Sequence, residues 1–259
     1  INLIEKEFRV YSQWGDDGII QFLIKKLNIR SKNFIEFGVS DFFESNTHFL
    51  LVNNNWNGFV IDGSTTNIET LRKSPIYWRY NIKSETAFIT KDNINQLISL
   101  SNFNQIGLLH IDLDGNDYWI LDSIDIAKLA PDILILEYNS NFGFERPITI
   151  PYEENFSRLK SHHSGQYFGA SLKALKILAE KKDYYFIGSN SAGNNAYFLL
   201  NKYKSIIPEV KIEDGYVSAS FRDSRNENNK LSFLSREDSI REIRGLNVYN
   251  IVTKEIEKF

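Results

Sequence analysis

The stretch Asn33-Phe34-Ile35-Glu36-Phe37-Gly38 is a short apolar run with one acid inside it and a glycine at its end. A run of this length that ends at a turn residue is typical of a buried strand. Ahead of it, residues 16–27 begin with two aspartates and carry apolar side chains at helical spacing, which predicts a helix. Beyond it, residues 58–62 form a second apolar run that ends in an acid. Ser45-Asn46-Thr47 can cap a helix that reaches about residue 52.

The same alternation continues along the chain. Further helices are predicted for residues 65–73, 92–100, 118–129 and 171–181, and further strands for 75–80, 106–111, 132–137, 184–187 and 196–200. Strands that alternate with helices favour a parallel sheet with helices on both faces. The turn at 188–195 is too short for a crossover helix, so the last two strands should form an antiparallel hairpin. The expected fold is α/β, with a doubly wound, mostly parallel seven-stranded sheet and an antiparallel edge hairpin.

Two parts of the chain depart from this pattern. Residues 139–168 have no clear period and contain two prolines and two glycines, which predicts a long loop or insertion beside the substrate. Residues 205–259 are more polar, with a helix expected near 236–244. We therefore expect an α/β domain over 1–204 and a C-terminal extension over 205–259 that serves as a lid or as a contact in a homodimer.

Composition excludes several classes of function. The 30 Lys and Arg against 33 Asp and Glu give a net charge of −3, which argues against a basic nucleic-acid groove. The absence of cysteine excludes disulfides, thiolate nucleophiles and cysteine-ligated metals. No apolar run approaches the roughly 20 residues of a membrane span. Residues 1–10 lack the apolar core of a signal peptide, so a cytoplasmic protein is expected.

Acids follow most of the predicted strands at the point where each strand ends. They lie in Glu36–Asp41, Asp62–Ser64, Asp112–Asp117 and Glu137–Asn139. In open α/β sheets the ligand binds beyond the carboxyl ends of the strands. Buried charges without partners cost several kcal/mol, so a carboxylate at each strand end indicates a binding site rather than a packing device.

Two of these strand ends fit a nucleoside. In Glu36-Phe37-Gly38 the glycine lets the backbone approach a ligand closely. Asp62, at the end of the next strand, is placed to accept hydrogen bonds from a ribose diol, and an acid there favours a free ribose over a 2′-phosphate.

Seven motifs over residues 11–200 resemble, in order, the FkbM-like branch of class I S-adenosylmethionine-dependent methyltransferases. They are SQWGDDG (12–18), FIEFGVSD (34–41), ESNT (44–47), IDLDGNDYW (111–119), EYN (137–139), YFGASL (167–172) and GNNAYF (193–198). The sequence departs from this family at Asp41-Phe42-Phe43, where a second glycine is usual. The expected edge hairpin also suits a methyltransferase sheet better than a dinucleotide-binding sheet, whose last strands need crossover helices.

The resemblance implies S-adenosylmethionine as cofactor, and often a sugar hydroxyl as methyl acceptor, in surface-polysaccharide or natural-product pathways. It implies that Glu36 and Gly38 flank the amino-acid part of the cofactor, that Asp62 binds its ribose and that Asp112 lies near the sulfonium. The cofactor-binding residues expected from the matching motifs are Gln13, Asp17, Glu36, Gly38, Ser40, Asn46, Asp62, Asp112 and Asp114.

A sugar hydroxyl is a very weak acid, so a base or a metal ion must help its deprotonation. Two arrangements are open. In the first, Asp112 or a histidine of the 139–168 loop, His162 or His163, is the general base. In the second, Asp112, Glu137 and Asn139 bind Mg²⁺ or Mn²⁺, with one of the two histidines as a further ligand. Arg146, Tyr152 and Tyr167 of the same loop are expected to line the acceptor site, as are Arg222 and Arg225.

Other functions compete with methyl transfer. Asp112-Leu113-Asp114 is an Asp-x-Asp at a strand end, as used by glycosyltransferases that hold a metal and a nucleotide sugar. A non-catalytic binding domain of the same fold is the third alternative, favoured by the missing glycine. A nicotinamide oxidoreductase is disfavoured because no Gly-x-Gly-x-x-Gly opens a helix.

Overall fold

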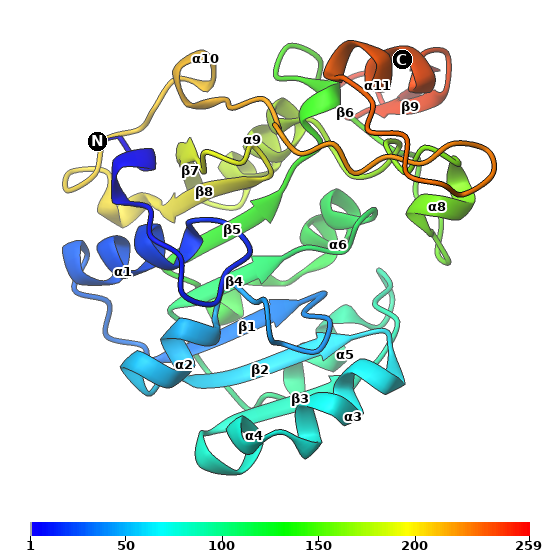
Figure 1. The fold of residues 1–259 in the computed structure, drawn as a ribbon. Helices are drawn as coiled ribbons and strands as arrows, with labels where there is room; N and C mark the ends of the chain where they lie inside the picture. Colours follow the sequence, from blue (N-terminus) through cyan, green and yellow to red (C-terminus); the bar gives the residue numbers. More distant parts are fainter. Residues whose placement is uncertain (1) are drawn as a thin grey trace.

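The computed structural model describes residues 2–259 and contains the predicted seven-stranded sheet. Its strand order is β3-β2-β1-β4-β5-β8-β7, which runs from the bottom to the top of the molecule in Figure 1. The strands are β1 (Asn33–Phe37), β2 (Asn57–Asp62), β3 (Ile82–Thr86), β4 (Leu108–Ile111), β5 (Ile133–Glu137), β7 (Tyr184–Ser189) and β8 (Asn195–Leu200). All neighbouring pairs from β3 to β5 are parallel, whereas β8 is antiparallel to both β5 and β7. The predicted fold, including the edge hairpin of β7 and β8, is therefore confirmed.

Helices cover both faces of this sheet because successive strand residues point to opposite sides. One face carries α1 (Asp16–Lys26), α2 (His48–Asn54), α3 (Thr65–Lys73) and α4 (Pro75–Arg79) against side chains such as Phe34 and Val60. The other carries α5 (Ile94–Ser99), α6 (Asp117–Ser123), α7 (Ile126–Leu129) and α9 (Leu172–Lys181) against side chains such as Ile35 and Ile61. The sheet is thus the middle layer of three, and only its strand ends are free to form a site.

The third predicted strand is wrong in position. Residues 75–80 contain β-branched and aromatic side chains, but Pro75 occupies the first turn of helix α4, where its missing N–H costs nothing. Strand β3 begins later, at Ile82, and pairs with β2 from Gly58 to Asp62. This shift matters for the site, because it makes residues 87–89 the segment that follows the carboxyl end of β3.

A second, smaller sheet joins the predicted insertion to the C-terminal extension. Its order is β10-β9-β6, with β6 (Ile148–Thr149) from the insertion and β9 (Asn247–Asn250) and β10 (Glu255–Lys258) from the extension. Helix α8 (Arg158–Ser161) and helix α11 (Arg236–Ile243) lie beside it, above the right-hand end of the large sheet in Figure 1. Ile148, Phe168, Ile243 and Val248 belong to a small apolar core of their own. Residues 205–259 therefore pack against the 139–168 region.

The remaining elements are short. They are the 3₁₀ helices η1 (Ile4–Lys6), η2 (Ser140–Phe142) and η3 (Asn201–Tyr203) and the helix α10 (Ile212–Gly215). Among the helices of residues 2–259, none combines the length and the apolar character that crossing a bilayer requires.

Candidate functional site

Two cavities lie at the carboxyl-terminal edge of the large sheet. Their volumes are about 260 Å³ and about 420 Å³, and both are lined by Gly38, Ser40 and Asp112, so they meet where β1 and β4 end. The first is also lined by Ile61, Asp62, Gly63, Ala87, Phe88, Ile89, Leu113, Asp114, Asn116 and Phe156. The second is also lined by Gln13, Trp14, Glu36, Asp41, Phe43, Glu44, Ser45, Asn46, His110, Asn194 and Asn195.

Gly38 makes the junction of the two cavities possible. Its φ of +75° lies in the left-handed region, and a Cβ atom at this position would come within 1.6 Å of the carbonyl oxygen of Asp112. No side chain fits there without moving strand β4. Glycine therefore lets the ends of β1 and β4 pack closely where the two cavities meet, and the approach of its backbone to a ligand stays a prediction.

The loop after β1 carries Asp41-Phe42-Phe43 in place of a second glycine and buries the middle residue of the three. Phe42 has a φ of +68° and is buried, with its ring stacked on Phe34 and on His48 at centroid distances of 6.5 and 5.0 Å. Phe43 is 66% exposed and stands at the edge of the second cavity. The two cavities are present although Asp41-Phe42-Phe43 stands where the resemblance predicts a second glycine.

Asp62 lies in the wall of the first cavity. Its Oδ2 accepts a hydrogen bond from the backbone N–H of Ser40, and its Oδ1 accepts one from the backbone N–H of Ser64, both at 2.8 Å. Asn67, in helix α3, donates to Oδ1 at 3.4 Å. The carboxylate thus joins the loops after β1 and β2, and its remaining lone pairs can accept hydrogen bonds from a diol in the cavity.

Glu36 lines the second cavity, and its carboxylate is held by hydrogen bonds from other residues of the protein. Its carboxylate accepts hydrogen bonds from the Ser45 hydroxyl at 2.5 Å, from the backbone N–H groups of Asn46 and Thr47 at 3.1 and 3.2 Å, and from the Thr47 hydroxyl. Nδ1 of His110 is 2.8 Å from Oε1. The Glu36 side chain therefore fixes the 45–47 loop that forms one wall of the cavity.

The Glu36–His110 contact changes the acidity of both groups. Burial acts to raise the pKa of Glu36, but the hydrogen bond and charge of His110 outweigh it, so this pKa lies below its ordinary value. Burial acts to lower the pKa of His110, and the hydrogen bond and charge of Glu36 reverse this and raise it. Both shifts favour an ion pair within the core.

Asp112, Asp114 and Glu137 form a cluster of carboxylates at the ends of β4 and β5, with one oxygen of each within 4.8 Å of the others. Burial and the negative charge of Asp114 raise the pKa of Asp112 to about 7. Burial and the charge of Asp112 raise the pKa of Glu137 well above its ordinary value, and its Oε2 has no hydrogen-bond partner among the described residues. Arg158 partly offsets the charge through an ion pair with Asp114 at 2.8 Å.

Asn139 is not part of this cluster, which corrects its expected role as a metal ligand. Its side-chain amide donates to the backbone carbonyls of Gln166 and Phe168 at 2.9 and 3.0 Å, and its oxygen accepts from the N–H of Asn141. The amide is fully used in closing the loop after β5. The third member of the cluster, beside Asp112 and Glu137, is Asp114 rather than the expected Asn139.

Asp17 lines neither cavity, which corrects the expectation that it contacts a cofactor. Its Oδ2 accepts hydrogen bonds from the backbone N–H groups of residues 10–12 at 2.7, 2.8 and 2.9 Å. These bonds fix the turn that presents Gln13 and Trp14 to the second cavity. Asp17 therefore contributes to the second cavity indirectly, by fixing the turn that carries Gln13 and Trp14.

Asp16, next to it, is fully buried and binds the edge hairpin. Its carboxylate accepts hydrogen bonds from Asn190 at 3.1 Å, from Asn195 at 3.1 Å and from the hydroxyl of Tyr197 at 2.5 Å. Burial raises its pKa, against the effect of these donors. This contact brings Asn194 and Asn195 to the second cavity, opposite Gln13.

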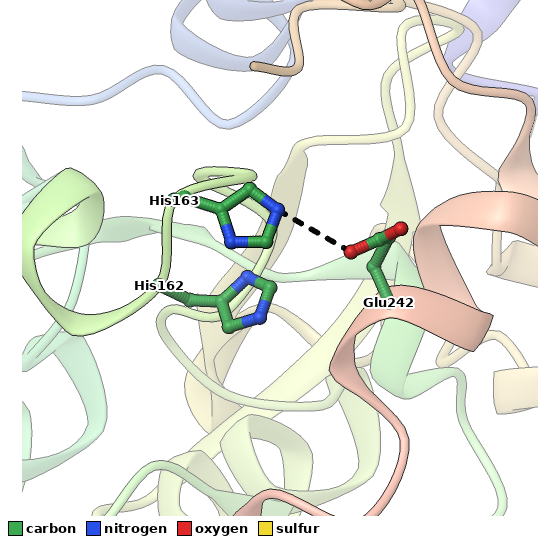
Figure 2. Close-up of side chains that lie close together, drawn as sticks. All are labelled: His162, His163 and Glu242. Carbon is green, nitrogen blue, oxygen red and sulfur yellow. Dashed lines mark ion pairs between the residues drawn. The ribbon is translucent and has the colours of Figure 1, made fainter. Parts of the chain in front are cut away.

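His162 and His163 line neither cavity, which corrects the expectation that one of them is a catalytic base or a ligand beside Asp112. Both follow helix α8 and turn toward Glu242 of helix α11 (Figure 2). Burial and the charge of His163 lower the pKa of His162. The two histidines belong to the junction of the insertion with the C-terminal extension.

The three expected acceptor-binding residues also lie elsewhere, and this too is a correction. Arg146 pairs with Glu257 at 2.6 Å in the small sheet. The hydroxyl of Tyr152 accepts a hydrogen bond from the backbone N–H of Lys91 at 3.3 Å, and that of Tyr167 donates to the carbonyl of Asn247. None of the three lines a described cavity.

Arg222 and Arg225 reach cavities of the upper part of the molecule. Arg222 lines one of about 250 Å³ beside Tyr138 and Asn139. Arg225 lines one of about 450 Å³, which shares Phe88, Leu113, Asp114 and Phe156 with the first cavity. Arg158 and Asp223 also line this third cavity.

Several lining residues were not predicted from the sequence. Ala87, Phe88 and Ile89 were missed because β3 was placed too early, and a correct end for β3 would have identified them. His110, which is buried and paired with Glu36, also lines the second cavity. Phe156 and Arg158 carry no sequence signal, since only the packing of the insertion brings them to the strand ends.

No protein-family model matches the sequence. None of the curated proteins matches it either. Among solved structures, the chain is similar to a "putative caffeoyl-CoA O-methyltransferase" from Staphylococcus aureus, with 11% identity and a TM-score of 0.50 over 76% of this chain and 87% of that chain. It is also similar to an O-methyltransferase from Bacillus cereus in complex with SAH, with 14% identity and a TM-score of 0.45 over 71% of this chain and 78% of that chain. At such identities the similarity concerns the fold alone, and this chain has the fold of the class I S-adenosylmethionine-dependent methyltransferases.

Proposed function

We propose that this protein is an S-adenosylmethionine-dependent O-methyltransferase that acts on a sugar or phosphorylated sugar of a surface-polysaccharide or related pathway. The observation that carries the proposal is the pair of cavities that meet at Gly38, Ser40 and Asp112, with Asp62 in the wall of the first. They lie at the strand ends where ligands of open α/β sheets bind.

The residues present fit the cofactor. The first cavity offers Asp62 to a ribose diol and Phe88, Ile89 and Leu113 as apolar walls for an adenine. Gly38 permits the close packing against Asp112 at the junction, since any Cβ atom would come within 1.6 Å of the carbonyl oxygen of Asp112. In the second cavity, Gln13 and the 45–47 loop held by Glu36 would hold the amino-acid end.

The cofactor supplies an electrophilic methyl group on a sulfonium, and the protein has to align and deprotonate the acceptor. In this proposal Asp112 accepts the proton of the attacking hydroxyl at its carboxylate, since it lies at the junction of the two cavities. Its pKa of about 7 suits a general base near neutral pH. Burial and the charge of Asp114 raise this pKa, and Glu137, with an oxygen within 4.8 Å, lowers it through a hydrogen bond.

The acceptor in this proposal enters through the third cavity. This cavity has a volume of about 450 Å³ and adjoins the first, with which it shares four lining residues: Phe88, Leu113, Asp114 and Phe156. Arg158 and Arg225 in its wall suit a phosphate, and the aromatic rings suit the face of a sugar. The resemblance to FkbM-like proteins supports the same class of acceptor. A cytoplasmic location and a homodimer remain part of the proposal.

A metal-dependent arrangement of the same carboxylates is the second candidate. It is favoured by Glu137, whose Oε2 is buried without a partner and lies close to Asp112 and Asp114. Oxygen ligands of this kind suit Mg²⁺ or Mn²⁺. Such an ion would assist methyl transfer, or, through Asp112-Leu113-Asp114, hold the diphosphate of a nucleotide sugar in a glycosyltransferase.

One set of assays separates these functions. The full chain is incubated with methyl-labelled S-adenosylmethionine and a panel of sugars, sugar phosphates and nucleotide sugars, with EDTA or with Mn²⁺. Label in an acceptor with EDTA present supports the base mechanism, and label only with Mn²⁺ supports the metal. Transfer of sugar from a UDP-sugar without methyl transfer would refute the proposal. If calorimetry also shows that the chain binds neither S-adenosylhomocysteine nor UDP, a non-catalytic domain is favoured.

A further inference from the structure

A group of potential metal ligands lies outside the cavities, where the insertion meets the C-terminal extension. It consists of His162 and His163, which follow helix α8, and Glu242, which lies in helix α11. Figure 2 shows the ring of His163 facing the carboxylate of Glu242, with the ring of His162 beside that of His163. The two histidines are half-buried and Glu242 is exposed, so the group is accessible from solvent.

The spacing of these groups suits an ion between them better than a direct hydrogen bond. One ligand atom of each residue lies within 4.8 Å of the other two. Nε2 of His163 is 3.4 Å from Oε2 of Glu242, whereas a charge-assisted hydrogen bond measures about 2.7–2.9 Å. Two ligand atoms on one tetrahedral zinc ion, at bond lengths of about 2.0–2.2 Å, lie roughly 3.3–3.6 Å apart.

The two histidine rings are also held beside each other. Their centroids lie 4.4 Å apart with an interplanar angle of 33°. Nδ1 of His162 accepts a hydrogen bond from the backbone N–H of Ser164 at 3.3 Å and lies 2.8 Å from the Ser164 hydroxyl, and these contacts fix the orientation of the ring.

We propose that His162, His163 and Glu242 bind a transition-metal ion of the Zn²⁺ class, and that this ion clamps the segment after helix α8 to helix α11. Two imidazoles and one carboxylate are ligands that Zn²⁺ accepts, with water in a fourth position. The site is separate from the Asp112 cluster, whose ligands are all oxygen atoms and suit Mg²⁺ or Mn²⁺.

The clamp would strengthen a junction that hydrogen bonds already outline. The backbone N–H of Arg225 donates to the carbonyl of Ser164 at 3.2 Å, and the side chain of Gln166 donates to the carbonyl of Asp223 at 2.6 Å. The same segment carries Arg158, which pairs with Asp114 at the cavities. An ion at this place would therefore fix the wall of the third cavity without touching it.

The test is calorimetric titration of the tag-free, metal-stripped full chain with ZnCl₂. The expected result is one equivalent bound with a micromolar or lower Kd, weakened at least about tenfold in His163→Ala and in Glu242→Ala. Two controls should bind like the wild type, Glu237→Ala on the same helix and the Asp112→Asn/Glu137→Gln double variant. Circular dichroism checks the fold of each variant.

Hydrogen exchange gives the second readout. Zn²⁺ should slow amide exchange over 158–166 and 236–244 in the wild type and leave it unchanged in Glu242→Ala. The proposal is overturned if the wild type binds no Zn²⁺, if His163→Ala binds it equally well, or if only the Asp112→Asn/Glu137→Gln variant loses it. Binding without slowed exchange at both segments would overturn the clamp.

Discussion

Nδ1 of His110 lies 2.8 Å from Oε1 of Glu36, and the two residues face each other in the register of strands β4 and β1. This buried pair ties Glu36, in the lining of the second cavity, to strand β4, which ends just before Asp112. Glu36 has a lowered pKa, so its contribution to stability is present above its ordinary value of 4.5 and is lost as the pH falls. His110 has a raised pKa, so its contribution is present below 6.5 and is lost as the pH rises through its folded value.

Replacing His110 by Gln should therefore be strongly destabilising. The variant leaves Glu36 buried without its charged partner, and the expected loss in the free energy of unfolding is about 3–5 kcal/mol near pH 6. Urea denaturation measures it, with half-buried His163→Gln in metal-free buffer as the control that changes it little. A loss below about 1 kcal/mol would show that Glu36 is satisfied by the 45–47 loop alone.

Changing Asp62 to Ala should weaken cofactor binding. A charged hydrogen bond is worth about 1.5–3 kcal/mol, so the Kd for S-adenosylhomocysteine should rise roughly 10- to 150-fold. Since Asp62 also accepts from Ser40 and Ser64, thermal unfolding must be measured beside calorimetry. The exposed Asp122→Ala is the matched control, and equal affinities in both variants would mean that Asp62 holds only the loops.

Changing Asp112 to Asn should reduce turnover far more than cofactor affinity. General-base catalysis contributes about 10²–10⁴-fold, and the amide keeps the shape of the side chain while losing its basicity. Methyl-transfer kinetics under saturating cofactor should show a kcat loss in this range, with the Kd for S-adenosylhomocysteine within a few-fold of the wild type. The opposite pattern would assign Asp112 to the cofactor rather than to the reaction.

The pH dependence of turnover should follow Asp112. Its pKa is raised to about 7 by burial and by Asp114, with Asp117 also raising it and His110 and the Glu137 hydrogen bond lowering it. Only the deprotonated form accepts a proton, so kcat should rise with pH and reach half its maximum near pH 7. A profile that is flat between pH 5 and 8 would contradict this role.

Gly38→Ala should close the junction of the cavities. Its Cβ atom would lie 1.6 Å from the carbonyl oxygen of Asp112, so strand β1 or β4 has to move. Gly143→Ala is a close control, because Gly143 has a similar φ of +69° and no atom within 4 Å of its added Cβ. Both variants should lose about 1 kcal/mol or more of stability from the backbone conformation, but only Gly38→Ala should lose binding of S-adenosylhomocysteine. Equal binding by both would refute the close approach at Gly38.

The sheet was predictable because its signals are local. Periods of apolar residues and short turns indicated six of the seven strands and the edge hairpin, and strand ends brought Gly38, Asp62 and Asp112 to one edge. The third strand failed because residues 75–79 have strand-like side chains but begin with a proline that suits a helix start.

The upper part of the site was not predictable from local patterns. Three of its residues have partners in residues 242–258, namely His163, Arg146 and Tyr167. Nothing in the 139–168 segment alone shows that it will pair with the last strands of the chain. The prediction that Asn139 binds a metal was wrong for a related reason. Its hydrogen-bond partners, Gln166 and Phe168, are brought to it by the way the insertion folds back.

Calorimetric titration of the full chain with S-adenosylhomocysteine, without added metal, tests the central claim most directly. The two joined cavities predict one equivalent bound with a micromolar Kd, and this binding should weaken in Asp62→Ala and persist in Asp112→Asn. Absence of binding by the folded wild-type chain, or metal-dependent binding of UDP in its place, would contradict the assignment of these cavities to S-adenosylmethionine.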